Sequence, residues 1–236
     1  MSIAEAPFAA AFTLWGSPVT WVEVAAFALS LAMVAANMRV NPVGWPLAIV
    51  ASLLYAALFA DSRLYGEAAL QFVFVAASLW GWWQWLRGRG DNGAALAVHR
   101  LSRRGLAWTA GGIAVAWPLA GLVLRRATDS DVPFLDALAT TGSVAGQVLL
   151  GRKVLENWHV WLAVNVFSVG LFASKALWLT SLLYALFALL SVAGWLAWLR
   201  RMRLAEAGAA EADSAGAATA VAPSAATAAR DAAAKT

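Results

Sequence analysis

Long apolar stretches alternate with short polar ones along most of the chain, and this pattern predicts its helices. A helix needs about 20 residues to cross a hydrocarbon core about 30 Å thick. Within a bilayer the backbone must satisfy its own hydrogen bonds, which favours helices over open strands. The predicted spans cover residues 21–38, 43–60, 66–86, 106–124, 133–150, 158–174 and 177–199. We therefore expect an all-α membrane protein with seven transmembrane helices.

Basic residues between the spans predict the orientation of the chain. With the N-terminus outside, most of them fall on the inner side, which agrees with the positive-inside rule. These inner residues are Arg39, Arg87, Arg89, Arg100, Arg103, Arg104, Arg152, Lys153, Arg200, Arg201 and Arg203. We therefore expect a multi-pass protein of a bacterial inner (plasma) membrane with its N-terminus outside and its C-terminus in the cytoplasm.

An internal repeat at an offset of 113 residues organises the spans. Gly81 to Trp85 closes the third span, as Gly194 to Trp198 closes the seventh, and the same offset aligns Trp45 with Trp158. Such self-similarity indicates duplicated structural units. Three crossings reverse the direction of a chain, so a single intervening span restores it. The pattern predicts parallel repeats in a 3+1+3 arrangement, an architecture typical of carriers with a site near midplane.

The repeat divides the chain into five segments. Residues 1–19 form an N-terminal extracytoplasmic segment and residues 20–86 the first three-helix repeat. Residues 87–132 are a linker that includes the fourth transmembrane helix, and residues 133–199 are the second repeat. Residues 200–236 are rich in Ala and poor in large apolar groups, which predicts a disordered cytoplasmic tail.

Composition supports the membrane assignment and weakens other functions. Hydrophobic residues make up 62% of the 236 residues and charged residues 13%, more apolar than a soluble domain. The sequence has no cysteine, and His99 and His159 have no metal-ligand spacing, so no metal, cofactor or catalytic residue is expected. The basic residues serve as topology signals, which argues against nucleic-acid binding. A membrane enzyme would need catalytic groups that are absent from the sequence.

Polar side chains within the spans are the first candidates for ligand binding, because burying them unpaired in hydrocarbon is costly. Gln71, Gln147 and Asn165 are amides, for which helix-to-helix bonding and substrate recognition remain open alternatives. The in-span serines more often pack helices or bond their own backbone. The acidic residues lie toward the span ends, which argues against a proton relay.

One face of the sixth span combines aromatic and amide side chains. Trp158, Trp161 and Asn165 follow each other at helical spacings of three and four. Indole faces bind planar cations by stacking and cation-π attraction, and an amide supplies both a donor and an acceptor. Trp45, the repeat mate of Trp158, is expected to complete this site. The remaining tryptophans near the inner arginines are expected to anchor the interface: Trp82, Trp83, Trp85, Trp195 and Trp198.

Several motifs between residues 20 and 200 carry a family resemblance. They are the segment 64–71, the pair Gly81 and Trp82 with Trp85, and the segment 152–161 with Asn165. In these motifs the chain resembles the PnuC family of nicotinamide riboside transporters. The resemblance implies a SWEET-like carrier, usually homotrimeric, that equilibrates nicotinamide riboside by facilitated diffusion. A separate cytoplasmic kinase would then trap the substrate for NAD synthesis.

The resemblance also implies which residues line the site and which other ligands are possible. The implied positions are Trp158, Trp161, Asn165, Thr180 and Tyr184. Thr180 stands where an amide is expected in a riboside carrier, and this departure concerns the ligand more than the fold. Relatives in the family carry thiamine and other vitamins, so a thiamine carrier is the alternative. A SWEET-type sugar carrier is disfavoured because the prolines do not keep the repeat register.

Overall fold

The computed structural model describes residues 8–14, 17–61, 65–90, 93–128, 132–174 and 178–233. All seven predicted helices are present, preceded by a short hairpin. The elements are β1 (Ala10–Leu14), β2 (Ser17–Thr20), α1 (Trp21–Met38), α2 (Gly44–Asp61), α3 (Tyr65–Arg87), α4 (Arg103–Ala127), α5 (Pro133–Gly151), α6 (Asn157–Ser174) and α7 (Trp178–Ala233). The chain divides into two compact units, Met1–Trp198 and Leu199–Thr236.

Four of the described helices are long and apolar enough to cross a membrane. They cover Trp21–Met38, Gly44–Asp61, Arg103–Ala127 and Ser181–Ala212. Large apolar side chains point outward along the helices, as at Phe72 on α3 and Leu189 on α7, which are 59% and 70% exposed. Such exposure is costly in water and favourable in lipid. These observations support a multi-pass membrane protein.

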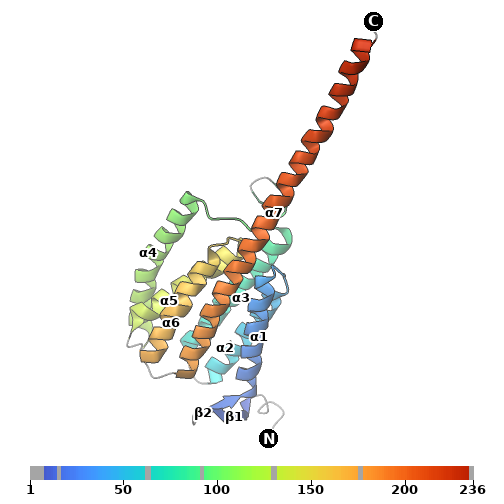
Figure 1. Cartoon of the computed structure of the whole chain (residues 1–236). Helices are drawn as coiled ribbons and strands as arrows, with labels where there is room; N and C mark the ends of the chain where they lie inside the picture. The colour runs from blue at the N-terminus through green and yellow to red at the C-terminus, as the bar shows by residue number, and fades with distance from the viewer. Residues whose placement is uncertain are drawn as a thin grey trace. The chain divides into compact units, whose positions relative to one another are not determined.

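The first unit is a helical bundle in which α5 contacts α3, α4 and α6. The helix pairs in contact include α1 with α2, α2 with α3, α3 with α5, and α5 with both α4 and α6. A helix enclosed by others can carry small and polar residues, because packing replaces lipid contact. This explains why α5 contains buried Gly142, Gly146 and Gln147. Helix α4 lies at the edge of the bundle beside α5 (Figure 1), and Gly121 is its buried residue.

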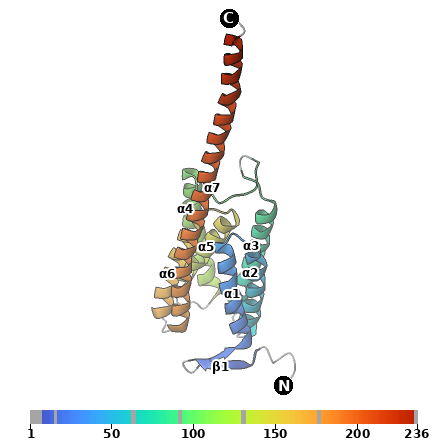
Figure 2. The ribbon, with the colours of Figure 1, turned by 45° about the vertical axis from the view of Figure 1, so that its right-hand side comes forward.

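A β-hairpin precedes α1 and was not expected from the sequence. Strands β1 and β2 pair antiparallel, with Leu14 opposite Ser17. Thr20 then caps α1, because its hydroxyl oxygen accepts a hydrogen bond from the Glu23 amide at 3.2 Å. The hairpin lies at the end of the bundle where α1 begins, and α1 and α5 run in the same direction (Figures 1 and 2).

Helix α7 differs from the sequence-based expectation at its C-terminal end. The sequence predicted a span ending near residue 199 and a disordered tail, whereas the structure describes α7 as helical to Ala233. Alanine has the highest intrinsic helix propensity, so an Ala-rich segment forms helix readily without tertiary contacts. The prediction of disorder rested on the low hydrophobicity of this segment, which leaves little packing energy. Low hydrophobicity does not, however, reduce the helix propensity of alanine.

The turns that end α1 and α5 have the same backbone conformation at positions 113 residues apart. Val40 and Lys153 both have φ of +54°. The Val40 amide donates to the Asn37 carbonyl oxygen at 3.0 Å, and the Lys153 amide donates to the Leu150 carbonyl oxygen at 2.9 Å. This is the pattern of a Schellman C-cap, in which the left-handed residue is usually Gly. The two turns are therefore local structural equivalents.

The segment between α3 and α4 is attached to the second of these turns. His99 pairs with Val154 in a parallel β-bridge. The His99 amide donates to the Lys153 carbonyl oxygen at 3.2 Å, and the Leu155 amide donates to the His99 carbonyl oxygen at 2.8 Å. The Glu156 carboxylate accepts from the Leu101 amide at 2.8 Å. The linker thus packs on the second half of the chain.

Candidate functional site

Two tryptophans predicted for the site occupy matching positions in α2 and α6. Trp45 is 1% exposed and Trp158 is 4% exposed. Trp45 lies against Gly81 of α3 and Trp158 lies against Gly194 of α7, and a Cβ at either glycine would overlap the facing indole. Both indole nitrogens are buried without a hydrogen-bond partner within the described part of the chain. The glycines therefore allow the indoles to insert between helices.

Two further tryptophans join this pair into a cluster of four. The Trp45 and Trp85 rings meet edge to face at 5.5 Å, and the Trp158 and Trp198 rings meet edge to face at 5.6 Å. Trp85 and Trp198 then meet each other at 6.2 Å. T-shaped aromatic pairs are favoured by the ring quadrupole. The tryptophan cluster, defined by these four residues, therefore connects the two repeated segments.

Trp85 and Trp198 also form reciprocal hydrogen bonds. Trp85 Nε1 donates to the Leu150 carbonyl oxygen at 3.0 Å, and Trp198 Nε1 donates to the Asn37 carbonyl oxygen at 2.9 Å. Donors and acceptors are each 113 residues apart, which is the arrangement expected of a self-complementary interface. The prediction that these two tryptophans anchor the membrane interface is wrong, because they are 6% and 0% exposed. Their indole N–H groups are second donors to these helix-end carbonyls, which also accept the Val40 and Lys153 amides of the following turns.

Two predicted amides are buried and each contacts a serine. Asn165 on α6 is 6% exposed, and its Nδ2 donates to Ser191 Oγ of α7 at 3.2 Å. Gln147 on α5 is 8% exposed, and its Nε2 donates to Ser78 Oγ of α3 at 3.1 Å. Ser78 and Ser191 are repeat mates, so the same serine position holds an amide in both halves. The positions that correspond to the amides in the first repeat are Val34 and Ser52.

The predicted aromatic and amide face of α6 is divided between two neighbours. Trp158 and Asn165 contact α7 through Gly194 and Ser191, respectively. Trp161 instead lies against Gly146 of α5, where an added Cβ would approach its indole to about 3.0 Å. Side chains three apart on a helix differ in direction by about 60°, so two helices packed on either side of one face can each contact one of them. Trp158 and Asn165 therefore both contact α7, whereas Trp161 contacts α5.

The other predicted residues contribute less to this arrangement. Gln71 on α3 is half-buried. Tyr184 on α7 is half-buried, and its ring meets Phe187 edge to face at 6.4 Å. The Thr180 side chain lies outside the described part of the structure. Ser78 and Ser191 also belong to this arrangement, although in-span serines were expected mainly to pack helices or bond their own backbone.

Lys153 links the tryptophan cluster to the linker. Its Nζ lies 5.2 Å from the centroid of the Trp85 ring. The same ammonium donates to the Leu96 carbonyl oxygen at 2.9 Å. A cation over an indole face is stabilised by the ring quadrupole. Lys153 therefore fixes the linker beside one edge of the cluster.

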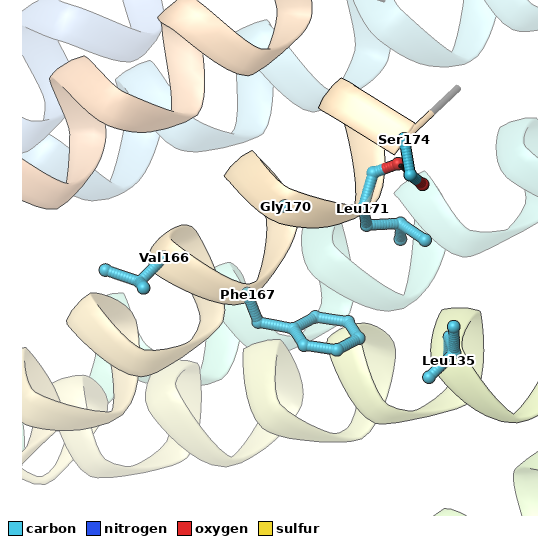
Figure 3. A pocket seen from close by; sticks show the side chains of 6 residues that line it. All are labelled: Leu135, Val166, Phe167, Gly170, Leu171 and Ser174. Carbon is cyan, nitrogen blue, oxygen red and sulfur yellow. Dashed lines mark hydrogen bonds between the residues drawn. The ribbon is translucent and has the colours of Figure 1, made fainter. Parts of the chain in front are cut away.

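Two open pockets lie away from the tryptophan cluster and the buried amides, and both are mainly apolar. One lies between α5 and α6 and is lined by Leu135, Val166, Phe167, Gly170, Leu171 and Ser174 (Figure 3). Ser174 already donates to the Leu171 carbonyl oxygen at 2.7 Å. The other is lined mainly by aliphatic side chains of α4, α5 and α6. Because a small-molecule site needs a few well-placed polar groups to orient its ligand, the amides and indoles are the better candidates for a binding site.

Metal chemistry gains no support from the described residues. Within the described ranges, no group of three or more His, Cys, Asp or Glu side chains is placed to hold a metal ion. The site consists of indoles, amides and hydroxyls, which recognise ligands by stacking and hydrogen bonding. The fold and these side chains indicate a polytopic membrane protein with a buried candidate site for recognition.

The sequence profile of the nicotinamide mononucleotide transporter family matches residues 20–200. The chain belongs to this family of membrane transporters, which includes the proteins named PnuC. It is 24% identical over 212 residues to the nicotinamide riboside transporter PnuC of Escherichia coli (strain K12), covering 80% of this chain and 89% of that protein. These relatives are transporters and not enzymes.

Two further comparisons concern the ligand range and the fold. The chain is 26% identical over 200 residues to the riboflavin/roseoflavin transporter RibM of Streptomyces davaonensis (strain DSM 101723 / JCM 4913 / KCC S-0913 / 768), covering 82% of this chain and 91% of that protein. The crystal structure of the vitamin B3 transporter PnuC matches with a TM-score of 0.61 and 22% identity, covering 76% of this chain and 81% of that one. The latter likeness establishes the fold.

Proposed function

We propose that this protein carries nicotinamide riboside across the bacterial inner membrane by facilitated diffusion. The observation that carries the proposal is the buried Asn165 amide, bonded to Ser191 on the helix that also packs against Trp158. An indole face suits the cationic pyridinium ring, and an amide suits the carboxamide on that ring. The family membership supplies the reaction class, and the two side chains supply the ligand chemistry.

The proposed carrier consists of two parallel three-helix units, α1–α3 and α5–α7, joined by α4. Supporting this SWEET-like 3+1+3 arrangement are the matched turns at Val40 and Lys153 and the reciprocal bonds of Trp85 and Trp198. In parallel-repeat carriers the substrate site lies between the halves, and the halves rock about it. We place the N-terminus outside and the C-terminus in the cytoplasm, as the basic residues favour.

The substrate gradient is maintained in this proposal by a cytoplasmic kinase. Phosphorylation would trap nicotinamide riboside inside the cell and feed NAD synthesis, so the carrier itself needs no ion coupling. This is tested in proteoliposomes loaded with buffer alone. Uptake should stop at equal internal and external concentrations, with or without a pH gradient. Sustained accumulation driven by the pH gradient would contradict facilitated diffusion.

Binding of purified protein to candidate vitamins tests the ligand. Isothermal titration should give the highest affinity for nicotinamide riboside, and Asn165→Ala should reduce that affinity at least about tenfold through loss of the amide contact. Thr141→Val removes a hydroxyl that donates to the Ala137 and Leu138 carbonyl oxygens within α5, and serves as a control. Tighter binding of thiamine would establish the alternative substrate.

Riboflavin is a second candidate because of the similarity to RibM. An isoalloxazine ring also stacks on indole and offers an N–H donor to an amide oxygen. The same titration with riboflavin separates the two candidates. Binding of riboflavin without binding of nicotinamide riboside would reassign the ligand while leaving the transporter class intact.

The proposed assembly is a homotrimer, as the family resemblance implies. Light scattering of the detergent-solubilised protein, corrected for bound detergent, gives the protein mass. A mass of three chains is expected, and a stable mass of one chain of 24.9 kDa would contradict the trimer.

A further inference from the structure

The hydroxyl proton of Ser191 is committed to its own helix. Ser191 Oγ donates to the Phe187 carbonyl oxygen at 2.8 Å. A serine hydroxyl has one proton and two lone pairs, so after this bond it can only accept. The contact of 3.2 Å with Asn165 therefore requires an N–H donor from the amide. The chemistry of Ser191 thus fixes which end of the Asn165 amide faces it.

This proton count determines what Asn165 presents on its other side. Since Nδ2 is directed to Ser191, the carbonyl oxygen Oδ1 points away from the serine. An amide without such a partner could rotate and present either its donor or its acceptor, because its two ends have the same shape. Ser191 is 3% exposed, so water cannot readily replace it as the partner.

We propose that Ser191 is a positioning residue that makes Asn165 present a hydrogen-bond acceptor to the transported ring. The site then selects rings that carry an N–H donor, such as a carboxamide, over the same ring bearing a carboxylate. A carboxylate offers only acceptors at neutral pH, so it would face Oδ1 without a shared proton. This inference rests on the proposed function, because it takes Asn165 as a ligand contact.

The other half of the chain uses the same serine position in a related way. Ser78 is the repeat mate of Ser191, is 1% exposed, and accepts from Gln147 Nε2 at 3.1 Å. Both amides belong to the second half, on α5 and α6. The serine position therefore accepts from a side-chain amide in both halves, and neither amide is duplicated by the repeat.

The experiment compares two ligands that differ only at the ring substituent. Isothermal titration measures the affinities for nicotinamide riboside and nicotinic acid riboside in the wild type, Ser191→Ala, Ser191→Thr and the control Thr141→Val. The two ligands differ in net charge and therefore in their attraction to the indoles. For each ligand, however, this attraction is the same in every variant. The change in the affinity ratio between variants therefore isolates the orientation of the amide.

We expect the wild type to prefer the carboxamide by at least about tenfold, as a lost buried hydrogen bond implies. Ser191→Ala should reduce this ratio by about tenfold, mainly by improving binding of the carboxylate, while Ser191→Thr and Thr141→Val keep it. A purely structural role would weaken both ligands equally and leave the ratio unchanged.

The outcomes separate this inference from the proposed function. An unchanged ratio in folded Ser191→Ala, with normal wild-type binding of nicotinamide riboside, overturns the inference alone. Absence of binding to the wild type overturns the proposed ligand, and the selection proposed here with it. A wild type that prefers the carboxylate likewise overturns the inference and leaves the transporter class intact.

Discussion

The indole of Trp198 on α7 donates a hydrogen bond to the carbonyl oxygen of Asn37 at the end of α1, across 161 residues of sequence. Its repeat mate Trp85 makes the equivalent bond to Leu150. Each bond gives a second donor to a carbonyl near a helix C-terminus that already accepts an amide of the following turn. The two bonds join the repeated segments to each other, and they are the basis of the first prediction.

Replacing Trp198 by Phe should destabilise the protein by about 1–3 kcal/mol, because it removes a buried hydrogen bond to the Asn37 carbonyl and part of a fully buried indole ring. Trp85→Phe should have a similar effect on Leu150. Thermal unfolding in detergent measures both changes. Trp83, which is 55% exposed, provides the matched control, since Trp83→Phe should leave the melting temperature nearly unchanged. Equal effects of all three substitutions would contradict the role of the reciprocal bonds.

Adding a methyl group at Gly194 or Gly81 should destabilise the bundle. The new Cβ would overlap the indole of Trp158 or Trp45, and overpacking of this kind costs about 1–3 kcal/mol. The control is Gly170→Ala on α6, where a Cβ would have no described heavy atom within 4 Å apart from its chain neighbours and its own helix backbone. We expect normal expression and melting temperature for Gly170→Ala and a lower melting temperature for Gly194→Ala.

The turn after α1 should be stabilised by Val40→Gly. A β-branched residue at φ of +54° is strained, and the left-handed conformation costs about 1–2 kcal/mol for non-glycine residues. Glycine removes this strain but increases the entropy of the unfolded chain, so the net gain should be about 1 kcal/mol or less. Arg39→Gly, at φ of −84°, should instead destabilise the protein. Thermal unfolding of both variants provides the comparison.

The absence of cysteine allows a direct test of topology. Ser102 and Thr128 cap the two ends of α4, so a single cysteine at either position marks one end of this helix. We expect a membrane-impermeant maleimide to label Thr128→Cys in intact cells and Ser102→Cys only after the membrane is opened. The reverse pattern would place the N-terminus inside and contradict the orientation proposed from the basic residues.

The sequence by itself determined the helices, because hydrophobic length is a local property. The predicted bounds of the first six spans lie within a few residues of α1 to α6. It also determined the repeat register, since Trp45 and Trp158 fall at the same offset as Gly81 and Gly194. The family followed from the same motifs. Each of these conclusions depends only on residues close together in the sequence or on a motif that recurs along it.

The tertiary structure decided which side chains meet. The sequence assigned Trp85 and Trp198 to the membrane interface, and only packing between segments buried them against helix-end carbonyls. It grouped Trp161 with Trp158 and Asn165, whereas the bundle turns Trp161 toward Gly146. Periodicity gives the direction of a side chain around its own helix and not the neighbour it reaches. The hydrogen bond between Asn165 and Ser191 could not be predicted for this reason, because it requires knowing that α7 packs against this face of α6.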